Sequence, residues 1–334
     1  MNKVTQKVRK LIAHARPVLC GEYSTDGSLV FTAGQDSIVN VICAYSGEIL
    51  EKYGPHITAT GTAIRSMAAS SDSRYIALGL NYERIIIHDR SNKNRKMEQN
   101  VDSKGVRVVL FSKNSKYLYV CTAKNDKDKS AVIKYQFTPD AAQILTPLMQ
   151  VEFEEDFKCA VLASDDSQIW FGTEKSIICL NAETLENLFS EDLNAPVCDL
   201  QIYKDAFVCC PIADSFNVFF YSMRELADIF SIKVHNRVNT AAPHPMINLM
   251  VIGGGLDPKL VAKTKEGNNV LTQYYDMINK RIILEQEVHA APTHKLRWSP
   301  DGLGLLSVSE DGSIAINRFG EELLQYKWEN DWTQ

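Results

Sequence analysis

The chain has 334 residues, of which 45% are hydrophobic and 23% charged, and its formal net charge is −5. This composition excludes wholesale disorder, and the mildly negative charge argues against sequence-specific nucleic-acid binding through a wide basic face. No apolar run reaches the length of a membrane span, and residues 1–19 lack the apolar core of a signal peptide, so we expect a cytoplasmic, soluble protein.

The first predicted element is a strand over residues 3–12, ahead of the first complete unit. Tyr23 to Cys43 then reads YSTDGSLVFTAGQDSIVNVIC, in which short apolar runs alternate with turn-forming residues. Met67 to Asp89, Val109 to Phe137 and Val161 to Asn181 repeat this plan. The chain is therefore built from copies of one β-rich unit.

Two blurred copies follow, from Leu200 to Ser222 and from Asn248 to Asp276, and a clear copy closes the chain from Leu296 to Gly320. In that last copy WSPDG matches the YSTDG of the first, so the aromatic-Ser-x-Asp-Gly turn recurs at both ends. The repeat length of roughly 40 to 50 residues is the period of propeller blades.

These units predict an all-β fold, a single seven-bladed β-propeller of four-stranded antiparallel blades spanning residues 1–334. A four-stranded sheet cannot bury both of its faces alone, whereas sheets stacked radially around an axis do. The strand over 3–12 is expected to complete the last blade and close the ring. The aromatic tail at 320–334 is the competing candidate for that place.

The units resemble WD repeats, in which a His before the first strand, a Ser or Thr in the second and an Asp in the following turn form a buried hydrogen-bonded set. His14, Thr32 and Asp36 fit this pattern, and His289, Ser307 and Asp311 fit it again. Asp214 stands at the equivalent turn of the fifth unit. We interpret all seven as structural, because such residues satisfy one another inside a blade.

A closer resemblance lies in DSIVNV (Asp36 to Val41) followed by YSGEILEKY, and in VNTAAPHPMINLMVIGGGLDPKLVAKTKEGN (Val238 to Asn268). With the segment from Gln273 to Gly302, these stretches are similar to the family of the i subunit of eukaryotic translation initiation factor three. The likeness covers essentially the full length. Ala262-Lys263-Thr264 replaces most of the family's threonine run, so the chain resembles a divergent member.

The triple glycine Gly253 to Gly255 belongs to this family signature and ends an apolar strand. A phosphate-binding loop would need a following helix and a Lys-Ser or Lys-Thr pair, and Asp257-Pro258 supplies neither. We expect a bulge that leads into a long loop on the rim of the propeller.

The resemblance implies a non-catalytic docking subunit. A helix near the C-terminus of the b subunit would bind across the fifth and sixth blades, the g subunit would join nearby, and the complex would act on the small ribosomal subunit. Of the two acidic family positions, one falls on Asp205 and the other on Tyr221, with Lys204 and Arg224 on the same rim. The competing interpretations are a plain turn residue for Asp205 and strand packing for Tyr221.

Two other functions compete with this interpretation. A different WD-repeat adaptor, of the receptor-kinase-associated or ribonucleoprotein-assembly kind, would lack GGGLDPKLVAKT. An enzyme using the central channel would need converging catalytic groups or metal ligands, and no His-Glu-x-x-His, Gly-x-Ser-x-Gly or Cys-x-x-Cys is present. The eight cysteines are irregularly spaced and are expected to be buried thiols. We expect no catalytic residues, metal or cofactor.

Overall fold

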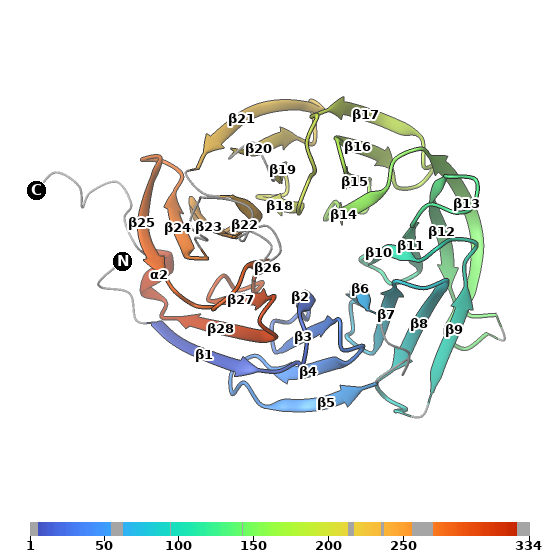
Figure 1. Ribbon diagram of the computed structural model, residues 1–334, viewed down its shortest axis with the longest axis horizontal. Coiled ribbons are helices and arrows are strands. Elements are labelled where there is room, and N and C mark those ends of the chain that lie inside the picture. The colour runs from blue at the N-terminus through green and yellow to red at the C-terminus, as the bar shows by residue number, and fades with distance from the viewer. Residues whose placement is uncertain are drawn as a thin grey trace, which may run out of the picture.

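The computed structural model describes residues 6–54, 63–93, 95–141, 143–212, 217–234, 237–255 and 270–325. Its strands form seven four-stranded antiparallel sheets, here called blades 1 to 7, arranged as a ring around a central axis (Figure 1). The expected all-β, seven-bladed propeller is therefore confirmed.

Each blade runs from an inner strand at the axis to an outer strand at the rim, and the blades are as follows. Blade 1 comprises β2 (Val18–Tyr23), β3 (Leu29–Gly34), β4 (Val39–Cys43) and β5 (Ile49–Tyr53). Blade 2 comprises β6 (Ile64–Ala69), β7 (Tyr75–Leu80), β8 (Arg84–Asp89) and β9 (Lys96–Asn100). Blade 3 comprises β10 (Val106–Phe111), β11 (Tyr117–Thr122), β12 (Ser130–Phe137) and β13 (Leu145–Phe153). Blade 4 comprises β14 (Phe157–Leu162), β15 (Gln168–Thr173), β16 (Ser176–Asn181) and β17 (Asn187–Asp192).

The remaining blades follow the same plan. Blade 5 comprises β18 (Gln201–Tyr203), β19 (Phe207–Ile212), β20 (Asn217–Ser222) and β21 (Ala227–Lys233). Blade 6 comprises β22 (Val238–Pro243), β23 (Leu249–Gly254), β24 (Thr272–Asp276) and β25 (Arg281–Gln286). Blade 7 comprises β26 (Thr293–Trp298), β27 (Gly304–Ser309), β28 (Ser313–Phe319) and, at its outer edge, β1 (Gln6–Ile12). The short helix α2 (Glu322–Gln325) follows β28.

The core of the molecule lies between the blades. Each pair of neighbouring blades, including blades 7 and 1, packs together through a shared hydrophobic cluster. In β3, Val30 belongs to the cluster shared with blade 7 and Phe31 to the cluster shared with blade 2, because successive side chains of a strand point to opposite faces. Full burial of a side chain such as Phe31 stabilises the fold by about 2 to 3 kcal/mol.

The ring is closed by the N-terminal strand. β1 pairs antiparallel with β28 from Gln6 opposite Phe319 to Ile12 opposite Ser313, so the first strand of the chain takes the outer position in the last blade. The Gln6 side chain also exchanges hydrogen bonds with Gln286 of blade 6. The competing tail is placed differently, since α2 follows β28 and buries Leu323 against blades 6 and 7; residues 326–334 lie outside the described part of the chain.

The aromatic-Ser-x-Asp-Gly motif forms the turn between the inner strand and its neighbour. Ser24 Oγ donates to Asp26 at 2.6 Å, and the Ser24 amide donates to the Leu29 carbonyl. Gly27 and Gly302 both have φ near +70°, a conformation that side-chain-bearing residues rarely adopt. The motif therefore sets where the inner strands of blades 1 and 7 end.

The triple glycine lets blade 6 pack closely. A Cβ on Gly254 would lie 1.9 Å from the Arg237 carbonyl oxygen, and one on Gly253 would lie 3.0 Å from Leu296 of blade 7. Gly255 has φ of +124°. The expected bulge lies in the paired strand β22, between Val238 and Thr240, and Gly253 and Gly254 belong to β23. The following segment, 256–269, lies outside the described residues.

Candidate functional site

The buried polar set of blade 1 has the geometry expected from its spacing. His14 Nδ1 lies 3.0 Å from Asp36 Oδ2, and His14 Nε2 lies 2.9 Å from Thr32 Oγ1. Burial alone would raise the pKa of Asp36, but the hydrogen bond and charge of His14 bring it below its ordinary value. The hydroxyl and imidazole are buried inside the blade, so the set links the loop after β1 to β3.

Blade 7 contains a similar set with an additional member. His289 Nε2 lies 2.7 Å from Ser307 Oγ, while His289 Nδ1 lies 2.7 Å from Ser313 Oγ, which in turn donates to Asp311 Oδ1 at 2.5 Å. Asp311 therefore reaches the imidazole mainly through Ser313, a residue that the sequence analysis missed. In the sequence, the only indication of this role for Ser313 is its position two residues after Asp311.

Blade 4 replaces the histidine with a carboxylate. Glu155, in the connection before β14, accepts hydrogen bonds from Thr173 Oγ1 and from Ser176 Oγ, the latter at 2.7 Å. Because the residue type differs, the repeat pattern does not reveal this set. Asp214, predicted to play the same part in blade 5, lies outside the described residues.

The predicted partner-binding residues Lys204, Asp205 and Arg224 are exposed on one face of the ring. Lys204 and Asp205 form the turn between β18 and β19, both with φ near +50°, and Arg224 lies in the turn between β20 and β21. Lys204 Nζ donates to Asn248 Oδ1 of blade 6 at 2.7 Å. Alternate connections of an antiparallel sheet lie at the same end, so we call the surface carrying these turns the turn face.

Tyr221 does not belong to this surface, which corrects the prediction that it contacts a partner. Its side chain is fully buried, and its ring packs against Trp170 and Phe189 of blade 4. Burial raises the pKa of its hydroxyl well above the ordinary value. Both faces of a blade are covered by neighbouring blades, so neither side of β20 is free to meet another protein.

Two apolar residues of blade 6 share the turn face and were missed by the sequence analysis. Met246, before β23, is 49% exposed, and Ile278, between β24 and β25, is 44% exposed. Tyr203 of blade 5 donates to Asn248 of blade 6, which holds the two sets of turns side by side. The available signal was an apolar residue inside a predicted turn, as in HPMIN and DMINK.

The central channel contains a buried ion-pair network. Asp199, just before β18, is 1% exposed and binds Arg297 through two hydrogen bonds of 2.7 and 3.0 Å and Lys295 through one of 2.7 Å. Burial would raise the pKa of Asp199, but Arg297 and Lys295 hold it well below its usual range. Thr240 Oγ1 also donates to Asp199, so three blades meet at one carboxylate.

Other groups along the channel are shielded rather than reactive. Burial raises the pKa of Glu22 to about 7, opposed by the amide of Ala69 and by Arg297. Burial likewise raises the pKa of the Cys20 thiol to about 12, which keeps it protonated and weakly nucleophilic. Cys209 and Cys210 pack into different interblade clusters, on opposite sides of β19.

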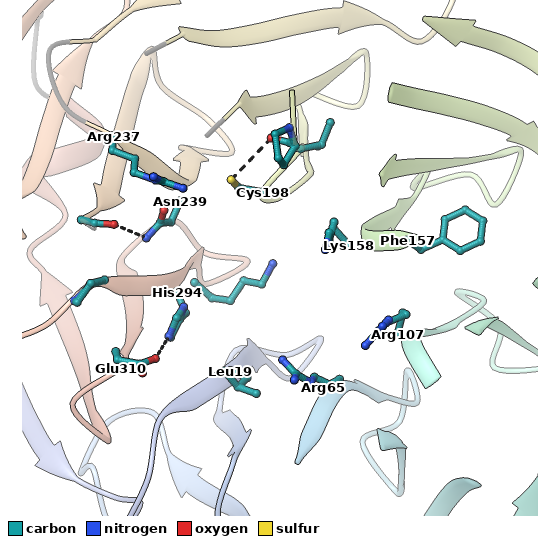
Figure 2. A pocket seen from close by; sticks show the side chains of 15 residues that line it. Leu19, Arg65, Arg107, Phe157, Lys158, Cys198, Arg237, Asn239, His294 and Glu310 are labelled. Atoms are coloured by element: carbon teal, nitrogen blue, oxygen red, sulfur yellow. Dashed lines mark hydrogen bonds and ion pairs between the residues drawn. The ribbon is translucent and has the colours of Figure 1, made fainter. Parts of the chain in front are cut away.

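The channel opens on the face opposite the turn face into a cavity of about 520 Å³ (Figure 2). We call this opening the channel mouth. It is surrounded by the second residues of the inner strands, including Arg65, Arg107, Lys158 and His294, and His294 lies 2.6 Å from Glu310. Within the described ranges, no group of three or more His, Cys, Asp or Glu is placed to hold a metal ion, and no helix is long and apolar enough to cross a membrane.

Comparison with known proteins agrees with the fold. The WD40 family, described as WD domain, G-beta repeat, matches residues 5–42. The β-propeller domain of Cps50 (Swd1) from Myceliophteria thermophila superimposes with a TM-score of 0.72 at 12% sequence identity, covering 94% of this chain and 99% of that one. The chain thus has the β-propeller fold, with a match to the WD repeat over residues 5–42.

Full-length relatives narrow the assignment. Eukaryotic translation initiation factor 3 subunit I of Saccharomyces cerevisiae (strain ATCC 204508 / S288c) is 24% identical over 97% of this chain and 95% of its own length. The protein of the same name from Taeniopygia guttata is 22% identical over 96% and 98%. The chain is thus similar, along nearly its whole length, to subunit I of eukaryotic translation initiation factor 3.

Proposed function

We propose that this protein is a non-catalytic scaffold of translation initiation factor 3 that acts in the cytoplasm, and that the turn face of blades 5 and 6 is its docking surface. As in the family it resembles, the partner would be a helix near the C-terminus of the b subunit, with the g subunit joining nearby and the assembly supporting initiation on the small ribosomal subunit.

The observation that carries this proposal is the composition of the turn face. The charged residues Lys204, Asp205 and Arg224 of blade 5 share this face with the exposed apolar side chains of Met246 and Ile278 from blade 6, and Lys204 is bonded to Asn248 of blade 6. An amphipathic helix places apolar residues on one side and charges beside them, so it matches such a surface. Asp205 can form a charge-assisted hydrogen bond with an Arg or Lys of the partner.

Binding of the purified chain to a peptide that spans the last helix of the b subunit tests the proposal. Ile278→Asp and Asp205→Lys are expected to weaken binding about tenfold or more, because each places a charge against the bound helix. Leu50→Asp, at an equally exposed apolar position on the outer strand of blade 1, is the matched control and should bind like the wild type. Wild-type affinity in both turn-face variants, or crosslinks confined to the opposite face, would overturn the assignment of this surface.

A further inference from the structure

A β-bulge that recurs from blade to blade places single residues around the channel mouth. In six of the seven blades the pairing of the inner strand shifts register after its first residue. A bulge leaves one residue out of the ladder and re-aims its side chain. The residues left out are Leu19, Arg65, Arg107, Lys158, Asn239 and His294, and all of them line the mouth (Figure 2).

Three successive blades carry a cation at this position. Arg65, Arg107 and Lys158 come from blades 2, 3 and 4, and Arg237 and Lys295 line the same cavity. Glu310 is the acidic residue in that lining, and it is bonded to His294. The mouth is therefore positively charged on a chain whose net charge is −5, and a cleft lined by one sign of charge concentrates ligands of the opposite sign.

Arg65 is the cation least compensated by the protein. Arg107 binds Asp156 at 2.7 Å and Lys158 binds Glu174 at 2.9 Å, whereas Arg65 forms no ion pair with any residue of the described ranges. The Arg65 side chain is exposed at the mouth, where partial loss of hydration, and after it the charge of Arg107, lower the pKa of its guanidinium. The like charges of Arg65 and Arg107 therefore interact, and only Arg107 is paired with an acidic residue. A bound anion would reduce the repulsion between them.

The surroundings favour an anionic side chain over a nucleic-acid backbone. Asp156, Glu174 and Glu310 lie among or beside the cations, and they would repel a continuous run of phosphates. A cavity of about 520 Å³ accepts one or two side chains of an extended peptide. We propose that the channel mouth binds an extended peptide segment through clustered anionic groups, carboxylates or phosphates, seated on Arg65, Arg107 and Lys158.

This binding does not depend on the proposed docking surface, because the two lie on opposite faces of the ring. Fluorescence anisotropy with three labelled peptides tests it: alternating Glu and Ser, the same peptide with phosphoserine in place of serine, and the same peptide with Gln in place of Glu. We expect both anionic peptides to bind and the neutral one not to. The anionic peptide that binds more tightly shows whether the mouth prefers carboxylate or phosphate groups.

Arg65→Gln should weaken binding about tenfold and Arg65→Glu more, because each loses a charge-assisted hydrogen bond. Arg224→Gln, which removes an exposed arginine from the turn face, should bind like the wild type. Equal binding of the neutral peptide, unchanged binding by Arg65→Glu, or tighter binding of a single-stranded RNA of similar length would each overturn the proposal.

Discussion

Asp199 of blade 5 and Arg297 of blade 7 form a two-bonded ion pair inside the central channel, with Nη1–Oδ2 and Nη2–Oδ1 distances of 2.7 and 3.0 Å. The pair joins two blades that are not neighbours. In blade 6, which lies between them, the Thr240 hydroxyl donates to the same carboxylate at 2.7 Å. Thr240 Oγ1 also accepts from the Leu296 amide of blade 7. One buried carboxylate therefore fixes the mutual placement of three blades.

Removing that carboxylate is expected to destabilise the ring strongly. In Asp199→Asn the cations Lys295 and Arg297 lose their buried counter-charge, which costs about 3 kcal/mol of unfolding free energy. Asp126→Asn is the matched control: its partner Lys104 and the aspartate itself are largely exposed, so the loss should stay under about 1 kcal/mol. Urea denaturation of both variants measures the difference, and equal stability would contradict the role assigned to Asp199.

Two buried histidines predict acid lability. Burial lowers the pKa of His244 and of His289 to about 4, from 6.5 for an unfolded-state imidazole. His244 Nε2 is bonded to the Gly302 carbonyl and Nδ1 accepts from the amides of Met246 and Ile247, so a second proton would break the latter bonds. The hydrogen bonds of this turn therefore require a neutral His244 imidazole.

Because the unfolded chain binds these protons at higher pH than the folded chain, stability is full above pH 6.5 and falls as the pH drops towards 4. Each histidine contributes on the order of 2 to 3 kcal/mol to that fall. Unfolding free energies of the wild type and His244→Gln, measured at about pH 7 and about pH 4.5, should show a smaller pH effect in the variant. An identical pH effect in both proteins would mean that His244 is not one of the responsible groups.

The glycines of the family signature should differ in their tolerance of a methyl group. Gly254→Ala places Cβ against the rigid Arg237 carbonyl and is expected to cost about 3 kcal/mol. Gly253→Ala meets side chains of Thr293 and Leu296 at 3.0 Å, which can yield, and should cost about 1 kcal/mol. Thermal denaturation ranks the two variants, and the reverse order would refute the close-packing explanation.

Strand β1 should be needed for a closed ring. Deleting residues 1–12 removes a seven-residue pairing with β28 and exposes the edge of blade 7, which should cost on the order of 5 kcal/mol. Ile12→Thr, at a side chain that is 86% exposed, should change stability by less than about 0.5 kcal/mol. Hydrogen exchange of β28 reports the effect directly. Unaltered protection after the deletion would show that another segment closes the blade.

Sequence reasoning succeeded where the chemistry is local. The Ser-x-Asp-Gly turns, the strand alternation and the spacing of His14, Thr32 and Asp36 depend on residues near one another in one repeat, and the structure has this geometry. It failed for Tyr221, because alternation along a strand does not distinguish the two buried faces of a blade from a free face. It also missed Glu155, whose residue type departs from the repeat pattern.

The sequence by itself determined the repeating unit and the number of blades, since these follow from periodic turns and apolar runs. Closure of the ring decided the rest. Asp199 and Arg297 are 98 residues apart and meet only when blades 5 and 7 surround the axis. Arg65, Arg107 and Lys158 look like isolated surface charges until bulges in three neighbouring blades bring them to one opening. Contacts between distant repeats form only when the blades are arranged around a common axis, and that arrangement depends on how whole blades pack against one another.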